Sequence, residues 1–223
     1  MSTTNRVYLV TDSDISQRAG HTVPFVVEEA CRAGIRWVQL REKTMSTRSF
    51  VELGLTFKTI TQRYGARLIV NDRIDVALAI DANGVHIGQD DMPYPLVRKL
   101  LGPDKLIGLS VNNMIELLAS QAYADIDYLG VAAIFATPTK LDTVSELGAL
   151  GLRDICLKTH LPTFAIGGIN ATNLQSIGQT GVTGVAVVSA ICGHPSPYDA
   201  ARQLIQLAQS YENIHPGSDN CRL

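Results

Sequence analysis

The stretch RLIVNDRIDVALAIDANGVHIGQ, Arg67–Gln89, contains one expected strand, one expected helix and a second strand. The two strand segments, 67–72 and 84–89, are short, rich in Val, Ile and Leu, and bounded by polar residues or Gly. Near-continuous apolar runs of this kind are typical of a parallel sheet that is covered by helices. The segment between them, 74–81, is the shortest helix that we expect in the chain.

The same alternation continues from one end of the chain to the other. Further expected strands lie at 6–12, 37–42, 106–111, 128–135, 163–168 and 184–191. Further expected helices lie at 23–34, 46–65, 93–102, 113–125, 145–159, 170–181 and 195–212. Eight strands, each followed by a helix, predict an α/β fold, a single-domain (β/α)8 TIM barrel. We expect the barrel to span residues 1–211 and a polar tail to follow at 212–223.

An open doubly wound sheet is the alternative architecture. It usually carries a GxGxxG turn after its first strand, and the segment TDSDISQRAG, 11–20, has none. The pattern therefore favours the closed barrel.

Composition excludes several classes of protein. The chain has 223 residues, of which 46% are hydrophobic, and a formal net charge of −2. Such a length can bury one large core, and the near-neutral charge argues against a nucleic-acid-binding protein. No signal peptide and no apolar run long enough to span a membrane are visible, so we expect a cytoplasmic protein. Its oligomeric state is left open, a homo-oligomer included.

The four cysteines, Cys31, Cys156, Cys192 and Cys221, have no CxxC spacing. This arrangement does not resemble a disulfide framework or a zinc site. We therefore expect reduced thiols, as is usual in the cytoplasm.

Polar residues gather where the expected strands end, which is where barrel enzymes place their active sites. They are Thr11, Asp12, Arg41, Lys43, Asn71, Asp72, Gln89, Asp90, Asp91, Ser110, Thr137, Thr139, Lys140 and Ser189, with Gly167 and Gly168.

Within the second strand, alternation predicts that Gln39, Arg41 and Lys43 share one face and that Glu42 lies on the other. Residues two apart are separated by about 6–7 Å along a strand, which suits the two ends of a diphosphate. The alternative is an ordinary strand end whose cations extend to water.

Two carboxylates, Asp72 and Asp91, are expected beside these cations at the ends of neighbouring strands. Mg²⁺ typically takes one or two carboxylates and completes its shell with water and substrate phosphates. The alternative is that both aspartates cap the following helices. Asp90 and Asp91 are adjacent, and we expect only one of them to be a ligand.

Two further segments offer groups for a phosphorylated ligand. The segment FATPTKLD, 135–142, supplies the hydroxyls of Thr137 and Thr139 and the cation of Lys140, unless it is only a Pro-containing turn. The loops after the last two strands often bind phosphate in barrels, which favours the backbone of Gly168 and of Val188 and Ser189. The alternative for Gly168 is a purely steric need for glycine. His86 lies within a strand, and we expect a core histidine with satisfied hydrogen bonds, with a substrate contact as the alternative.

Taken in order, the motifs QLREK, NDRIDVALAIDANGVHIGQDDMP, GLSV, IFATPTKLD, AIGGI and AVVSAI resemble the thiamine-phosphate synthase family. The resemblance covers almost the whole expected barrel. It implies a transferase of thiamine biosynthesis whose substrates are 4-amino-2-methyl-5-(diphosphomethyl)pyrimidine and 4-methyl-5-(2-phosphoethyl)thiazole. The products would be thiamine phosphate and diphosphate, formed through a dissociative pyrimidine carbocation.

The resemblance also implies roles for individual residues. The pyrimidine diphosphate would be bound by Gln39, Arg41, Lys43, Asn71, Ser110 and Lys140, of which Arg41, Lys43, Ser110 and Lys140 would be catalytic. The thiazole phosphate would be bound by Thr137, Thr139, Gly168, Val188 and Ser189, and Mg²⁺ by Asp72 and Asp91. The chain departs from the family pattern at Ala132, Ala133 and Ala136, where the family usually has Gly-Pro and Pro.

Two other functions would fit part of this pattern. A thiazole tautomerase on the same barrel would handle thiazole phosphate and no diphosphate. A non-catalytic barrel that binds thiamine phosphates would keep the phosphate site alone. The joint presence of Arg41, Lys43, Asn71 and both aspartates favours the synthase.

Overall fold

The computed structural model describes residues 6–123, 125–136, 146–209 and 211. Its strands are β1 (Val7–Val10), β2 (Trp37–Leu40), β3 (Arg67–Asn71), β4 (Gly84–Ile87), β5 (Leu106–Val111), β6 (Tyr128–Val131), β7 (Thr163–Ile166) and β8 (Gly184–Val187). Its helices are α1 (Ser13–Arg18), α2 (Val23–Ala33), α3 (Thr47–Arg63), α4 (Ile74–Ala79), α5 (Tyr94–Leu101), α6 (Met114–Ser120), α7 (Gly148–Cys156), the 3₁₀ turn η1 (Leu174–Ile177), α8 (Ser189–Cys192) and α9 (Pro197–Ala208).

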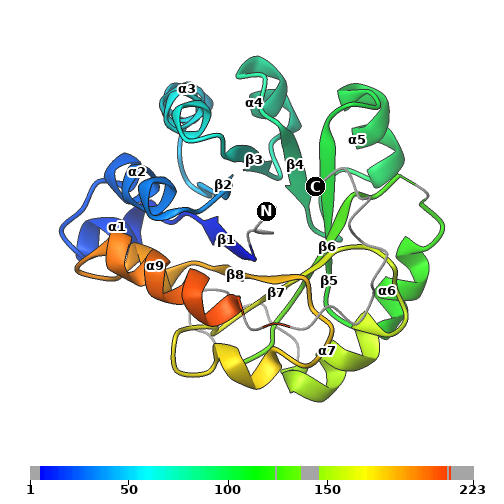
Figure 1. Ribbon diagram of the computed structural model, residues 1–223. Helices are drawn as coiled ribbons and strands as arrows, with labels where there is room; N and C mark the ends of the chain where they lie inside the picture. The colour runs from blue at the N-terminus through cyan, green and yellow to red at the C-terminus, as the bar shows by residue number, and fades with distance from the viewer. Residues whose placement is uncertain (1–5, 124, 137–145, 210, 212–223) are drawn as a thin grey trace.

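The strands form one closed parallel barrel in the order β1 to β8, which confirms the predicted fold class. Each strand pairs with the next, and β8 pairs with β1 through the register Val7↔Val185 to Leu9↔Val187. In Figure 1 the strands surround the centre of the view and the helices lie outside them. The open doubly wound alternative is thereby excluded.

Some element boundaries differ from those expected. The short helix α1 was not predicted; the Asp12 side chain caps it by accepting a hydrogen bond from the backbone N–H of Ile15 at 2.9 Å. Between β7 and β8 the expected helix 170–181 is reduced to the single turn η1. The last strand ends at Val187, because the backbone of Val188 leaves the extended region and starts α8. The predicted tail 212–223 lies outside the described residues.

The barrel interior is filled by four aromatic rings. The centroids of Tyr8, Trp37, Tyr128 and Phe164 lie 5.5–6.0 Å apart in every pair, and the Arg67 guanidinium lies 5.0 Å from the Trp37 centroid. An aromatic pair contributes about 0.5–1.5 kcal/mol beyond its buried area. The cluster is therefore substantial beside a net domain stability of roughly 5–15 kcal/mol.

A second, larger core lies between the strands and the helices. Along β1 the side chains of Val7 and Leu9 join this outer core, while Tyr8 and Val10 join the inner one. This alternation places every second residue of a strand inside the barrel. Inward-facing side chains near the carboxyl end of a strand therefore lie at the barrel mouth.

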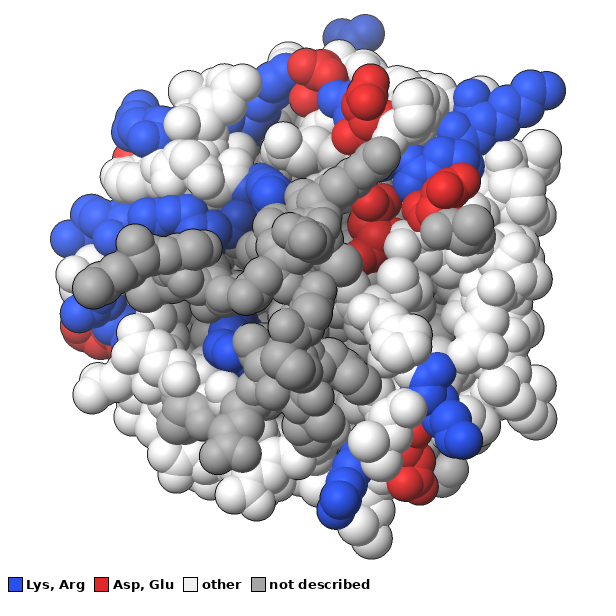
Figure 2. All heavy atoms as spheres, turned by 45° about the vertical axis from the view of Figure 1, so that its right-hand side comes forward, with Lys and Arg blue, Asp and Glu red and all other residues white. Residues whose placement is uncertain are grey.

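Charges of both signs are mixed on the surface. On the face drawn in Figure 2, acidic side chains lie beside basic ones at several places. This agrees with the formal net charge of −2. None of the helices that the structure describes combines the length and apolar content needed to cross a bilayer.

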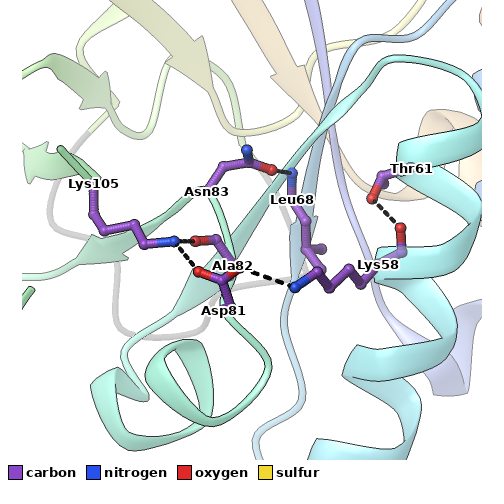
Figure 3. A network of polar contacts seen from close by, with 7 residues as sticks. All are labelled: Lys58, Thr61, Leu68, Asp81, Ala82, Asn83 and Lys105. Carbon is purple, nitrogen blue, oxygen red and sulfur yellow. Dashed lines mark hydrogen bonds and ion pairs between the residues drawn. The ribbon is translucent and has the colours of Figure 1, made fainter.

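A polar network joins successive units on the side where helices lead into strands (Figure 3). Asp81, just after α4, forms ion pairs with Lys105 and with Lys58 of α3, the latter at 3.1 Å. Lys105 also donates to the Ala82 carbonyl at 2.7 Å, and the Asn83 side chain accepts from the backbone N–H of Leu68 at 2.7 Å. Helix-to-strand loops lie opposite the active-site end of a barrel, so this network has a structural role.

Asp81→Asn should lower the urea midpoint of unfolding at pH 7, and Asp81→Ala should lower it further. Both variants lose the lysine partners that hold the pKa of Asp81 down to about 2. Alanine adds strain, because Asp81 has a positive φ of 50° that Asn tolerates. The folded-state pKa is depressed, so the contribution of this carboxylate is present at neutral pH and is lost as the pH falls toward 2. A midpoint deficit of Asp81→Asn that stays constant from pH 7 to pH 3 would contradict this assignment.

Candidate active site

A cavity of about 520 Å³ opens at the carboxyl ends of the strands. Every predicted site residue that the structure describes lines this cavity: Gln39, Arg41, Lys43, Asn71, Asp72, Asp91, Ser110, Gly168, Val188 and Ser189. The remaining predicted residues, Thr137, Thr139 and Lys140, lie outside the described residues.

The two cations after β2 reach the cavity from a loop. The strand ends at Leu40, so strand alternation explains the inward position of Gln39 but not those of Arg41 and Lys43. The strand is shorter than the expected 37–42, although all three side chains line the cavity and Glu42 does not. Instead, the buried Thr11 side chain accepts a hydrogen bond from the backbone N–H of Arg41 at 3.1 Å, which ties this loop to the end of β1.

Glu42, between the two cations, is turned away from the cavity. It accepts a hydrogen bond from the Ser13 hydroxyl at 2.5 Å, at the start of α1. Burial raises the pKa of the Glu42 carboxyl, and this hydrogen bond partly offsets the effect. This contact explains why Glu42 does not line the cavity although its neighbours Arg41 and Lys43 do.

Asp72 is held at the end of β3 in a left-handed conformation, with φ of 60°. It is not a helix cap, because α4 follows Arg73 and has no side-chain cap. Burial raises the pKa of Asp72 to about 7, helped by a hydrogen bond with Asp91 and by the charge of Asp91. Arg41 and Asn71 oppose this rise. Near neutral pH the pair therefore holds a proton readily, as two crowded carboxylates do.

The loop after β4 brings Asp91, rather than Asp90, into contact with Asp72. The Asp91 side chain accepts a hydrogen bond from the backbone N–H of Gly88 at 2.6 Å, which folds the loop back on itself. Asp90 also lines the cavity but is exposed. Within the described ranges no three carboxylate, thiol or imidazole groups cluster as a complete metal site. Two carboxylates fit Mg²⁺, whose remaining ligands are usually water and substrate oxygens.

The opposite wall of the cavity includes Gly168, Val188 and Ser189. Gly168 has φ of 66°, and a Cβ there would lie 2.5 Å from the Ala136 carbonyl oxygen and 2.9 Å from Phe135 Cβ. The steric need for glycine is thus present, and Gly168 lines the cavity as well. Val188 and Ser189 enter this wall where β8 gives way to α8.

The floor contains polar residues that no sequence motif indicated. Tyr8 and Tyr128 line the cavity although both are almost fully buried, and their hydroxyls are 3.0 Å apart. His86 has the satisfied ring nitrogens that we expected, with Tyr128 and Ser110 as partners, and it also lines the cavity. Strand positions of aromatic residues predict only packing, so no sequence signal marked these hydroxyls.

The cavity wall after β5 includes Glu116, which was not among the site residues expected from the sequence. Its carboxylate accepts hydrogen bonds from the backbone and side chain of Asn112 at 2.8 and 2.9 Å, and from the Asn113 side chain at 2.8 Å. Asn113 in turn caps α6 by accepting from the Glu116 backbone N–H at 3.0 Å. The N-x-x-E spacing is a capping-box pattern, which could have identified this corner from the sequence.

Comparisons with known proteins agree with one another. A family model described as thiamine monophosphate synthase matches residues 7–191. A thiamine-phosphate synthase of Vibrio parahaemolyticus serotype O3:K6 is 47% identical over 202 residues, which cover 91% of this chain and 97% of that relative. One from Chloroflexus aurantiacus is 48% identical over 200 residues, covering 89% and 90%. The solved thiamine phosphate pyrophosphorylase from Pyrococcus furiosus has a TM-score of 0.83 at 34% identity, covering 94% of this chain and 98% of that one.

Asp72→Asn should stabilise the protein at pH 8 in buffer free of divalent cations, and much less at pH 5. The folded-state pKa is raised to about 7, so the wild type loses stability as the pH rises through that value. Asn carries no charge and tolerates the positive φ. Thermal unfolding at both pH values measures the difference, with exposed Asp90→Asn as the control. An equal effect of Asp72→Asn at the two pH values would contradict the raised pKa.

Proposed function

The chain belongs to the thiamine monophosphate synthase family, and on that premise we propose how its cavity performs the reaction. The chain is a thiamine-phosphate synthase, a transferase of thiamine biosynthesis, so the family resemblance of its motifs is confirmed. The tautomerase and the non-catalytic barrel are correspondingly disfavoured. The reaction we assign joins the pyrimidine diphosphate to the thiazole phosphate and releases diphosphate.

The diphosphate group is bound by Arg41, Lys43 and Ser110, together with Lys140. One observation carries this assignment: cations and carboxylates from neighbouring strand ends converge on one cavity. Arg41 can bind phosphate oxygens as a two-pronged donor, and the lysines act as point charges. Negative charge grows on the departing diphosphate, so these groups stabilise the transition state more than the bound substrate.

Asp72 and Asp91 are the residues that would hold Mg²⁺. The setting of Asp72 supports this role, because a bound cation would offset the burial and the nearby Asp91 that raise the pKa of Asp72. When bound, Mg²⁺ supplies positive charge that neutralises phosphate oxygens. Asp72 follows β3 and Asp91 lies in the loop after β4, so the two would hold the metal from neighbouring strand ends.

Bond cleavage is dissociative. The C–O bond breaks with its electron pair going to the diphosphate, and the pyrimidine methylene becomes a carbocation. The thiazole nitrogen then donates its lone pair to that carbon, which forms the new C–N bond. No protein nucleophile takes part, so the contributions of the chain are charge stabilisation, alignment of the two rings and exclusion of water.

The thiazole phosphate occupies the other side of the mouth. Gly168 and the Val188–Ser189 backbone contact its phosphate, together with Thr137 and Thr139. Gly168 lines the cavity at this place, beside Val188 and Ser189, which supports the placement. Gln39 and Asn71, across the cavity, contact the pyrimidine diphosphate.

We further propose that the enzyme works in the cytoplasm on small-molecule substrates alone, without nucleic acid. Cys31, Cys156 and Cys192 are buried and, among the described residues, form no disulfide, which suits a reducing compartment. Burial raises the pKa of Cys31 and Cys156 to about 12, so both stay protonated.

Arg41→Ala and Lys140→Ala should each lower the rate of diphosphate release by about 10²–10³-fold, as loss of one transition-state stabiliser typically does. The assay combines both substrates with Mg²⁺ and measures diphosphate and thiamine phosphate. Arg63→Ala is a matched control, because Arg63 pairs with Glu28 on the outer helices. Near-normal turnover of both variants would contradict the proposed roles. Isomerised thiazole without diphosphate would favour the tautomerase.

Asp72→Asn should raise the Mg²⁺ concentration needed for half-maximal activity, because one of two carboxylate ligands loses its charge. Asp90→Asn should leave the titration nearly unchanged, since Asp90 is exposed and lies outside the Asp72–Asp91 pair. Equal Mg²⁺ titrations of the wild type and Asp72→Asn would remove Asp72 from the metal site.

A further inference from the structure

A continuous chain of hydrogen bonds crosses the cavity floor from β2 to β5. Gln39 Nε2 donates to the Tyr8 hydroxyl at 3.0 Å, and the hydroxyls of Tyr8 and Tyr128 are 3.0 Å apart. The Tyr128 hydroxyl lies 3.2 Å from His86 Nδ1, and His86 Nε2 lies 3.0 Å from Ser110 Oγ. The two ends, Gln39 and Ser110, are both proposed to contact the pyrimidine diphosphate.

The middle of this chain occupies space that two glycines leave free. A Cβ at Gly108 would lie 2.1 Å from Tyr128 Cζ and 2.5 Å from His86 Nδ1. A Cβ at Gly130 would lie 2.9 Å from His86 Cε1. The rings of His86 and Tyr128 are 5.5 Å apart and tilted by 30°. The glycines of β5 and β6 therefore leave the space that these two rings occupy.

The protons along the chain can be assigned from one end. The Tyr8 hydroxyl accepts from Gln39, and among the described residues Tyr128 is the acceptor available for its single proton. Burial raises the pKa of both phenols, so each keeps its proton near neutral pH. The contact with Tyr8 then uses the proton of Tyr8, so His86 Nδ1 is the partner left, within the described part of the chain, to accept the proton of Tyr128.

The same reasoning determines what the two ends present to a ligand. With Nδ1 as an acceptor, a neutral His86 carries its proton on Nε2 and donates it to Ser110. The Ser110 hydroxyl proton is then free to point into the cavity. At the other end the Gln39 amide nitrogen is engaged by Tyr8, so its carbonyl oxygen is the group offered to a ligand.

Reversing one end would reverse the other. A turned Gln39 amide would accept from Tyr8 and offer its nitrogen to the ligand. Every later hydrogen bond would then run the opposite way, and Ser110 would donate to His86. The chain thus couples an acceptor at Gln39 to a donor at Ser110.

We propose that Tyr8, Tyr128 and His86 are positioning residues that keep the Gln39 carbonyl and the Ser110 hydroxyl proton facing the substrate. A carbonyl at Gln39 selects a pyrimidine with an exocyclic amino group over one with an oxo group at the same place. The Ser110 proton is left for an oxygen of the diphosphate. This selection rests on the proposed placement of the pyrimidine beside Gln39.

The tautomer of His86 tests the direction of the chain without any substrate. Nitrogen-15 NMR of the histidine-labelled protein at neutral pH, with His86→Gln to assign the signals, should show a neutral ring protonated on Nε2. A ring protonated on Nδ1, or on both nitrogens, would overturn the proposed direction whatever the enzyme's reaction.

Tyr8→Phe tests the selection itself. The wild type should bind 4-amino-5-hydroxymethyl-2-methylpyrimidine about tenfold more tightly than its 4-oxo analogue, the cost of one unmatched buried hydrogen-bonding group. In Tyr8→Phe the Gln39 amide is free to turn, so this ratio should fall to within about twofold.

Tyr211→Phe is the matched control, because it also removes a buried phenol hydrogen bond, to the Leu174 carbonyl at 2.8 Å. It should lose stability but keep the wild-type binding ratio. A folded Tyr8→Phe with an unchanged binding ratio would overturn the positioning role. If Tyr8→Phe does not fold, Tyr128→Phe breaks the same chain of hydrogen bonds. A His86 tautomer that is unchanged in that variant, as seen by NMR, would then overturn the role. If Gln39→Ala binds the amino compound as tightly as the wild type does, the pyrimidine lies elsewhere, and the selection is overturned for that reason.

Discussion

Closure of the parallel sheet is the constraint on which the site depends. Once β8 pairs with β1, all eight strands point the same way around one ring. Their carboxyl ends must then meet at one rim, whatever the separation in sequence. This is how Asn71, Ser110 and Ser189 come to line one cavity. An open sheet with the same strands would spread these residues along an edge.

The closed ring also has to be filled, and the filling serves the site. Four aromatic rings occupy the interior below the mouth, and Tyr8 and Tyr128 belong both to this cluster and to the cavity floor. Their rings contribute packing, while their hydroxyls continue into the hydrogen-bonded chain that ends at Gln39 and Ser110. Tyr8 and Tyr128 therefore serve both stability and substrate recognition. A Tyr→Phe substitution keeps the ring and removes the hydroxyl, so it separates the two roles.

The carboxylates at the barrel mouth lower the stability of the folded protein when no cation is bound. Burial, together with the neighbouring Asp91, raises the pKa of Asp72 to about 7, and Arg41 offsets this only in part. A cation that binds the folded protein would recover the lost stability through its own affinity. By contrast, the Asp81 carboxylate at the other end of the barrel is paired with two lysines of the chain. The two ends thus use carboxylates for different purposes.

The order of the strands, the class of fold and the residues at the strand ends were determined by the sequence alone, because periodicity and punctuation by Gly and polar residues are local properties. The family followed from the same local motifs, since QLREK and NDRID are contiguous. Tertiary structure decided that Arg41 and Lys43 enter the cavity from a loop tied to Thr11, that Asp72 is not a cap, and that Tyr8, Tyr128 and His86 form one chain. These outcomes depend on distances between residues far apart in the chain, and those distances exist only once the barrel has closed.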